Sequence, residues 1–175
     1  MIPRNHLRRA MTISWMPDIT MEDSQDSLSR VRNKALALLS RRELSTKMLR
    51  DKLHQKEFHS KDIETVIEDF TERGWLSDTR FMEVFCRDEI SKGHGKMKLM
   101  WNGRNKGLDE KLLNQHLNEQ EIDWFNQAVT AYNRRFFNKP IADFKDKSKR
   151  LRYLVSRGFS YEEANYALSN PDADI

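Results

Sequence analysis

The sequence predicts an all-α protein made of three tandem repeats of three helices, stacked into an elongated, curved array. Only six glycines and four prolines occur among 175 residues, while 33% of the residues are charged, a balance that favours helices over turn-rich β structure. Similar turns recur at intervals of 50 and 51 residues: Lys56-Glu57-Phe58, Lys106-Gly107-Leu108 and Arg157-Gly158-Phe159. Because one such repeat buries its apolar face poorly, neighbouring repeats are expected to stack.

The repeats are expected to follow a flexible N-terminal tail, residues 1–28. This segment contains Pro3, Pro17 and an acidic polar run, without a sustained apolar period. The predicted boundaries of the three repeats are 29–76, 77–122 and 123–175.

The first repeat shows the 3.6-residue apolar period of helices in three successive segments. The apolar positions are Val31, Ala35, Leu38 and Leu39, then Leu49 and Leu53, then Ile63, Val66, Ile67 and Phe70. Ser45 and Ser60 are the predicted N-caps of the second and third helices, and Gly74 is predicted to end the third helix at its C′ position.

The second and third repeats place the same helix face after each recurring turn. Equivalent apolar positions are Ile63, Leu113 and Ala164, and four residues later Ile67, Leu117 and Leu168. Ser160 and Glu163 predict a capping box in the third repeat. Acidic pairs open the third helices, where negative charge complements the helix dipole: Asp62 with Glu64, Asp109 with Glu110, and Glu162 with Glu163.

No catalytic residue, cofactor site or metal site is predicted, so the chain is not expected to be an enzyme. The histidines lack metal-ligand spacing, and the single cysteine, Cys86, can form neither an internal disulfide nor a thiolate cluster, which suits a reduced, cytoplasmic setting. Lys92-Gly93-His94-Gly95 lies between predicted helices, which indicates an interhelical turn and not a phosphate loop. No apolar run reaches the ~18 residues that cross a membrane, and no signal peptide or anchor is predicted.

Basic residues gather in two stretches, each in the second helix of a repeat or at its entry. Stacking is expected to align them into one stripe that binds a phosphate backbone or an acidic protein groove. A solvated helix face, balanced by acids elsewhere, is the alternative. The candidate filament- or DNA-binding residues are Lys92, Lys96, Lys98, Arg104, Lys106, Lys145, Lys147, Lys149, Arg150, Arg152 and Arg157. Trp101 lies inside the first stretch, where a core position is favoured over stacking on a nucleobase.

Several segments, in order and at consistent spacing, resemble the RecX family of bacterial regulators of the RecA recombinase. They are Ala35–Glu43, Arg73–Phe81, Lys92–Gly95, Lys106–Leu108, Ile122–Trp124, Phe144–Lys147 and Tyr153–Phe159, and they span about three quarters of the chain. The sequence departs from the family pattern at Ser77, Glu89, Lys96 and Gly103. A glycine inside a helix costs ~1 kcal/mol relative to alanine, and Met100 or Trp101 is expected to fill the space beside Gly103.

The resemblance implies tandem three-helix repeats and a regulatory function. A protein of this kind would bind the helical groove of RecA filaments as a monomer. It would limit filament extension, ATP hydrolysis, strand exchange and co-protease activity in DNA repair and the SOS response, with weak, non-specific contact to single- and double-stranded DNA. The alternative is a stand-alone, non-sequence-specific DNA-binding protein, whose affinity falls more steeply with salt. A metal-dependent nuclease is disfavoured, because no converging carboxylates are visible.

Overall fold

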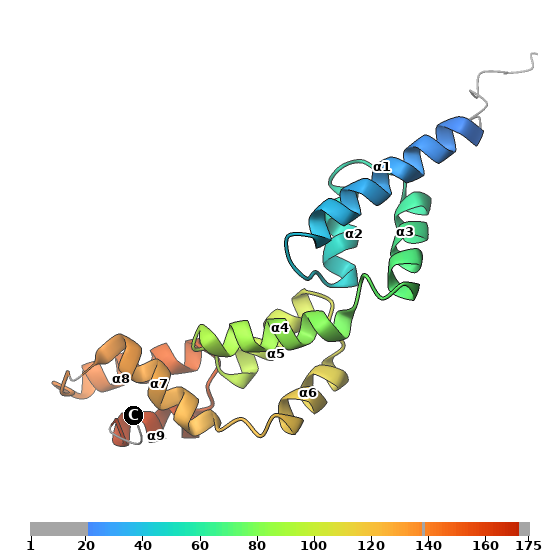
Figure 1. The fold of residues 1–175 in the computed structure, drawn as a ribbon. Helices are drawn as coiled ribbons and strands as arrows, with labels where there is room; N and C mark the ends of the chain where they lie inside the picture. The colour runs from blue at the N-terminus through green and yellow to red at the C-terminus, as the bar shows by residue number, and fades with distance from the viewer. Residues whose placement is uncertain (1–20, 138, 172–175) are drawn as a thin grey trace, which may run out of the picture.

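The computed structural model describes residues 21–137 and 139–171, and every regular element within these ranges is a helix. The helices follow one another in three groups of three along an elongated, curved array, which confirms the predicted all-α repeat architecture (Figure 1). The bounds are α1 Met21–Leu39, α2 Thr46–His54, α3 Ser60–Glu72, α4 Asp78–Ser91, α5 Lys96–Asn105, α6 Glu110–Glu119, α7 Trp124–Phe136, α8 Phe144–Ser156 and α9 Tyr161–Ser169.

Each group of helices has its own apolar core, as the 3.6-residue period predicts. The most deeply buried side chains include Leu49, Ile63 and Phe70 in the first core, Leu99 and Leu113 in the second, and Leu154, Phe159 and Ala164 in the third. Two half-buried side chains connect these cores. Met48 packs against the first and second cores, and Trp124 packs against the second and third.

The recurring turn has the same backbone conformation in all three groups. Its central residues, Glu57, Gly107 and Gly158, have φ values of 60°, 84° and 92°. This left-handed conformation ends the second helix of each group, where glycine is the usual residue. Gly74 ends α3 in the same way with φ of 69°, and the amide of Trp75 donates to the carbonyl of Phe70 over 2.8 Å, as expected of a C′ glycine.

The predicted helix caps are present except for one, and the start of the first helix also differs from the prediction. The Ser45 hydroxyl accepts from the Met48 amide, and Ser160 and Glu163 form the reciprocal capping box. The prediction for Ser60 is wrong: Ser60 is the first residue of α3, and His59 occupies the N-cap position without a side-chain cap. Helix α1 begins at Met21, within the segment expected to be a tail, and residues 1–20 lie outside the described ranges.

The packing beside Gly103 also differs from the expectation. A Cβ atom at Gly103 would lie 2.5 Å from Leu113 Cδ2 and 3.3 Å from Phe85 Cε1, so these two side chains occupy the space. Neither Met100 nor Trp101 fills it. The absence of a side chain at Gly103 lets Leu113 of α6 pack directly on the α5 backbone, and Trp101 is left on the opposite side of the helix.

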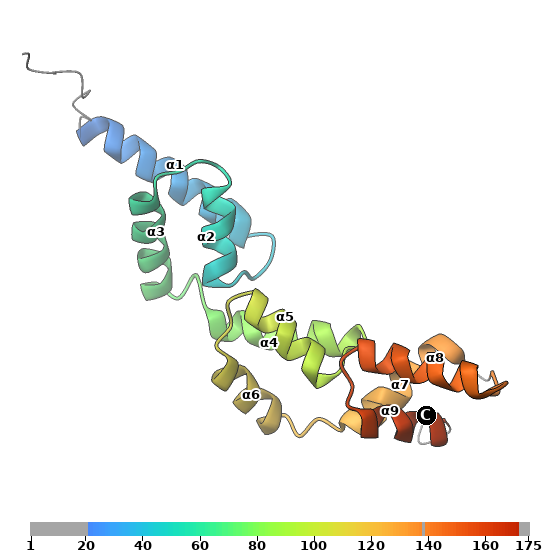
Figure 2. The same cartoon turned by 180° about the vertical axis from the view of Figure 1, so that it is seen from behind.

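The second helices of the three groups follow one another end to end, and we call α2, α5 and α8 the second-helix line (Figure 2). At one junction the Gly95 amide donates to the Arg157 carbonyl over 2.9 Å, and the Met97 amide donates to the Gly158 carbonyl over 3.1 Å. At the other, the Ser45 hydroxyl donates to the Lys106 carbonyl over 2.5 Å. The last carbonyls of one helix therefore meet the first polar groups of the next, which satisfies atoms that helix ends leave unpaired.

Candidate functional site

The candidate cations fall on two members of the second-helix line and on the turns that join it. Lys96, Lys98 and Arg104 belong to α5, and Lys106 and Lys92 lie just beyond its two ends. The cations of the second basic stretch, from Lys145 to Arg152, belong to α8, and Arg157 follows this helix. Of the whole set, only Arg150 is buried. The sequence prediction that the basic stretches lie in the second helices or at their entry is confirmed except for Lys106 and Arg157, which lie at the C-terminal ends of α5 and α8.

Arg150 is 3% exposed and cannot belong to an outward-facing binding stripe. Its guanidinium donates to the Tyr132 hydroxyl and to the Lys139 carbonyl, each over 2.7 Å, and to the Pro140 carbonyl over 3.0 Å. It also forms a 2.6 Å salt bridge with Asp146. Arg150 therefore holds α8 against α7 and the segment between them, and its inclusion among the candidates is wrong.

Three cations share the outward face of α8. Lys145, Lys149 and Arg152 are spaced by four and three residues, which places them on one side of a helix. All three are exposed, whereas Arg150 and Leu154 are buried on the inward side. The side chains of the outward face can therefore contact a ligand without disturbing the core.

Helix α5 turns Leu99 and Gly103 inward and leaves its aromatic residue outside. The Trp101 side chain is 52% exposed, so the predicted core position is wrong. The Lys98 ammonium lies 4.6 Å from the centroid of the indole ring, in a cation–π contact. Cationic and aromatic groups therefore share the exposed surface of this helix.

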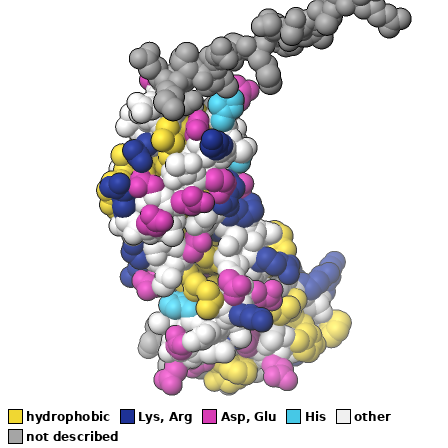
Figure 3. All heavy atoms as spheres, turned by 90° about the vertical axis from the view of Figure 1, so that its right-hand side faces the viewer, with side chains coloured by type: hydrophobic (Ala, Val, Ile, Leu, Met, Phe, Trp, Pro, Cys, Tyr) yellow, Lys and Arg dark blue, Asp and Glu magenta, His cyan; other side chains and the backbone are white. Residues whose placement is uncertain are grey.

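Salt bridges are more frequent in the first group of helices than among the candidate cations. In the first group, Arg32, Lys47, Arg50 and Arg73 are each paired with a carboxylate. Figure 3 accordingly shows Lys and Arg interspersed with Asp and Glu over the upper part of one face. Among the candidate cations, only Lys92 and Arg150 pair with a carboxylate of a described residue. The remaining nine keep their charge available to an external anion.

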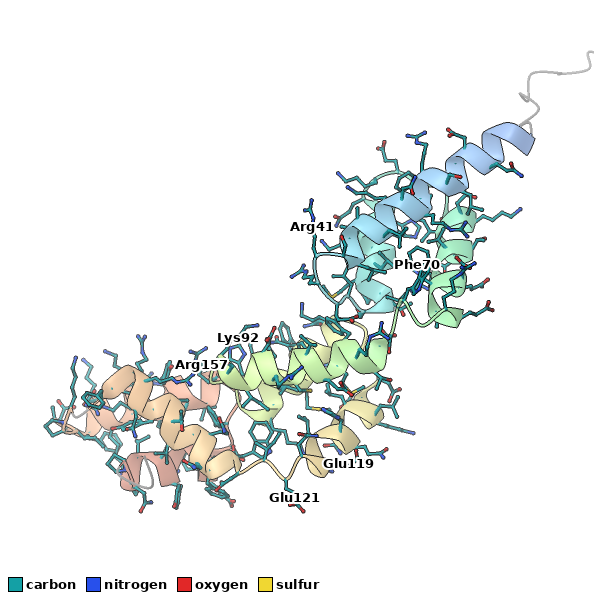
Figure 4. All side chains as sticks on the ribbon, viewed as in Figure 1. Arg41, Phe70, Lys92, Glu119, Glu121 and Arg157 are labelled. Carbon is teal, nitrogen blue, oxygen red and sulfur yellow. The ribbon has the colours of Figure 1, made fainter. Side chains whose placement is uncertain are left out.

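Several charged residues can be placed on the two sides of the bend. Figure 4 shows Arg41, Lys92 and Arg157 on the inner side of the bend, and Glu119 and Glu121 on the outer side. Arg41 follows α1 in an exposed turn, and the sequence prediction missed it because it lies outside both basic stretches. The two consecutive arginines, Arg41 and Arg42, were the sequence feature that could have indicated it.

Two further cations of α7 escaped the sequence prediction. The guanidinium of Arg135 lies 5.0 Å from the centroid of the Tyr153 ring, and that of Arg157 lies 5.5 Å from the same centroid. The Arg134 guanidinium donates to the Ser91 carbonyl over 2.6 Å, across the junction between α7 and α4. Tyr153 thus brings a cation from α7 next to one that follows α8, although they are far apart in sequence.

A buried carboxylate fixes the turn that carries Lys92. Glu89 is 4% exposed and accepts hydrogen bonds from Asn102 and from the Lys92 ammonium, the latter over 3.0 Å. His94 Nδ1 lies 2.8 Å from the same carboxylate. Burial raises the pKa of Glu89, but the hydrogen bonds from Asn102, Lys92 and His94 outweigh it and hold the pKa below its ordinary value. The departure from the family pattern at Glu89 therefore has a structural function.

The described part of the chain offers little for covalent or metal chemistry. Residues 21–137 and 139–171 contain no group of three His, Cys, Asp or Glu side chains placed to hold a metal ion. Burial raises the pKa of the Cys86 thiol to about 11, and the thiolate that acts as a nucleophile is correspondingly disfavoured. Over the same ranges, no helix has the length and apolar character of a membrane span.

Comparison with known proteins identifies the family. Residues 32–70 match the first three-helix domain of RecX, and residues 121–168 match the third. The regulatory protein RecX of Legionella pneumophila (strain Corby) is 33% identical over 132 residues, covering 75% of this chain and 88% of that protein. The chain belongs to the RecX family. The regulatory protein RecX of Actinobacillus pleuropneumoniae serotype 5b is 38% identical over 127 residues, covering 73% of this chain and 83% of its own length.

Solved RecX structures have the same fold. The crystal structure of RecX from Lactobacillus salivarius superposes with a TM-score of 0.68 at 22% identity, covering 86% of this chain and 99% of that one. A second crystal structure of a regulatory protein RecX gives a TM-score of 0.71 at 17% identity, covering 88% of this chain and 80% of the other. The repeat architecture of RecX proteins is therefore retained at low sequence identity.

Proposed function

We propose that this RecX-family chain is a cytoplasmic, monomeric regulator that binds RecA filaments on DNA and mainly inhibits them. It would limit filament extension, ATP hydrolysis, strand exchange and co-protease function in DNA repair and the SOS response. The observation that carries the proposal is the second-helix line, in which α5 and α8 present cations that are unpaired within the described residues. The curved array offers a long surface for a filament groove.

Two physical effects support this function. Cations spread along an elongated surface attract a polyanion or an acidic groove wall over many contacts, and they accelerate association at low salt. Apolar side chains on the same surface, including Trp101, add a component that salt does not screen. Recognition of a filament should therefore retain affinity at salt concentrations that release a protein held by phosphates alone.

Hydrolysis of ATP by RecA on single-stranded DNA provides the direct test. The full chain is titrated into the reaction with DNA in excess, so that competition for bare DNA is limited. Inhibition at protein concentrations well below that of RecA is expected. Absence of inhibition, together with measurable binding to naked DNA, would overturn the proposal in favour of a stand-alone DNA-binding protein.

Charge reversal on the outward face of α8 tests whether that face binds the RecA filament. The α8 reversal variant carries Lys145→Glu, Lys149→Glu and Arg152→Glu, and it should inhibit only at much higher concentration while remaining folded. A matched control places the same charge change on residues of α1 and α3: Arg30→Glu, Lys34→Glu and Lys61→Glu. Equal inhibition by the α8 reversal variant and the wild-type chain would remove this surface from the proposed function.

A further inference from the structure

Trp101 is exposed without a structural reason that the described residues supply. The other well-exposed tryptophan with a defined environment, Trp75, is 45% exposed and packs edge-to-face against the core residue Phe70, with ring centroids 5.2 Å apart. No aromatic ring of a described residue packs against Trp101, whose ring contact is the Lys98 ammonium. Trp75 therefore closes a core, whereas Trp101 presents a large apolar ring to the exterior.

A hollow lies directly beside this indole. It has a volume of about 390 Å³ and is lined by Trp101 with Met97 and Met100, by the cations Lys96 and Arg104, and by Glu110. Met97 is itself 67% exposed. The hollow thus combines apolar side chains, an aromatic ring, two cations and one carboxylate, and Lys98 adds a third cation over the indole ring.

We propose that this hollow binds an unpaired nucleobase of single-stranded DNA, stacked on Trp101. The cations Lys96, Lys98 and Arg104 would contact the phosphates on either side of that base. This inference rests on the DNA contact in the proposed function and names the group that the α5 surface recognises. Stacking on an aromatic ring beside a positively charged groove is the usual chemistry of single-strand binding, because every base offers a flat π face.

The charge distribution favours a nucleic-acid strand over an acidic peptide. The cations of α5 and those of α8 lie on helices that meet end to end, where the Gly95 and Met97 amides donate to the carbonyls that follow α8. This extended line suits a polymer with one negative charge and one flat ring in each unit. An acidic peptide with one apolar anchor would need the hollow but not the continuation along α8.

Glu110 orients the base within the hollow. A carboxylate repels phosphate, but it accepts hydrogen bonds from the N–H groups on the edges of nucleobases. The edge of the base is therefore expected to point toward Glu110, at the start of α6, and the phosphates to lie toward the cations of α5.

Binding to a fluorescent single-stranded oligonucleotide tests the proposal with the full chain. Trp101→Ala should weaken binding about 5- to 140-fold, which corresponds to roughly 1–3 kcal/mol for one stacked base. Trp101→Phe, which keeps a ring, should recover part of the loss. Trp75→Ala is the matched control for removing an exposed tryptophan, and it should change affinity little once folding has been verified by circular dichroism.

Two further substrates separate stacking from charge. An abasic strand of equal length keeps the phosphates and loses the bases, so the wild-type and Trp101→Ala chains should bind it equally. Duplex DNA of equal length should likewise show no effect of the substitution, because its bases are already stacked. Equal affinity of the wild-type and Trp101→Ala chains for the intact single strand would overturn the proposal.

The same variants in the RecA assay keep this proposal separate from the regulatory one. If Trp101→Ala weakened inhibition but left single-strand affinity unchanged, Trp101 would contact protein, and the base site would be wrong. If the wild-type chain failed to inhibit RecA but Trp101→Ala still weakened single-strand binding, the regulatory function would fail and the base site would stand.

Discussion

Gly95 and Gly158 lie so close that a Cβ atom on Gly95 would come within 2.5 Å of the Gly158 carbonyl carbon. The contact joins the N-terminal end of α5 to the turn after α8. Gly95 has φ of −80°, so alanine would be acceptable to its backbone and would be opposed only by crowding. Backbone atoms supply the obstacle, and they cannot rotate away as a side chain can.

Gly95→Ala should therefore separate the second and third groups of helices. Overpacking of this kind costs typically 1–3 kcal/mol. Urea unfolding should show the loss, and small-angle X-ray scattering should show a changed overall shape. Gly74→Ala is the control, since its Cβ would meet nothing within 4 Å and only its φ of +69° opposes alanine. Unchanged scattering and stability in Gly95→Ala would contradict a rigid junction.

Glu89→Gln should make stability less dependent on acid pH. The folded pKa of Glu89 is lowered, so its ionised form contributes stability above the unfolded carboxyl pKa of about 4.3. That contribution is lost as the pH falls through the folded pKa. Urea midpoints should show a deficit of about 1–3 kcal/mol at neutral pH, from weakened bonds to a buried charge, that shrinks in acid. The exposed neighbour Asp88, changed to Asn, provides the control, and a deficit independent of pH would argue against the ionised carboxylate.

Arg150→Ala should mainly reduce stability, whereas Lys149→Ala should mainly reduce DNA binding, although the two residues are adjacent. Loss of Arg150 leaves Asp146 and two backbone carbonyls without their partner and should cost on the order of 3 kcal/mol of unfolding free energy. Loss of the exposed Lys149 should change stability by less than about 0.5 kcal/mol. Thermal unfolding measures the stability of each variant, and DNA titration measures its binding affinity. A fully stable Arg150→Ala chain with weakened binding would return Arg150 to the binding surface.

Neutralising the outward face of α8 should reduce the salt dependence of single-strand binding. For single strands the logarithm of the binding constant falls with the logarithm of salt concentration by about 0.7 for each phosphate contacted. A chain with Lys145→Gln, Lys149→Gln and Arg152→Gln should therefore show a slope smaller by about 2.

The control for this measurement is the corresponding glutamine variant at Arg30, Lys34 and Lys61, which lie in α1 and α3. It should retain the wild-type slope, because these residues lie in the first group and outside the second-helix line. A loss of affinity on α8 without a change of slope would mean that these cations do not contact phosphates.

The fold was largely predictable because burial follows local periodicity. The positions of Ile63, Leu113 and Ala164 after each turn are set by helical spacing, and all three side chains are fully buried. Ser45 and Ser160 were predictable as caps because the hydrogen bonds of a cap are made within one helical turn. The N-cap of α3 was predicted at Ser60 but lies one residue earlier, because local sequence specifies the exact helix boundary weakly.

The binding surface was less predictable because exposure depends on distant partners. Arg150 and Lys149 look alike in a basic stretch, but only Arg150 faces the Tyr132 hydroxyl and the carbonyls that precede α8. Trp101 resembles a core residue in the sequence. In the structure, Leu113 packs on the inward face of α5 at Gly103, and Trp101 lies on the exposed face. In both cases the deciding group comes from another helix or from a connecting segment, which no local pattern reveals.

The recurring left-handed turn also affects how a second molecule could contact the array. A Cβ on Gly107 would lie 2.5 Å from Lys47 Cβ, and one on Gly158 would overlap the backbone of Lys98, because another second helix begins there. Glu57 has the same conformation at the end of α2, where no second helix of another group begins within the described residues, and its side chain is exposed. A second molecule docking there as α5 docks on α8 would collide with this side chain. The Glu57 side chain is therefore an obstacle to head-to-tail contact through this turn, the kind of contact that forms open polymers when it does not close into a ring.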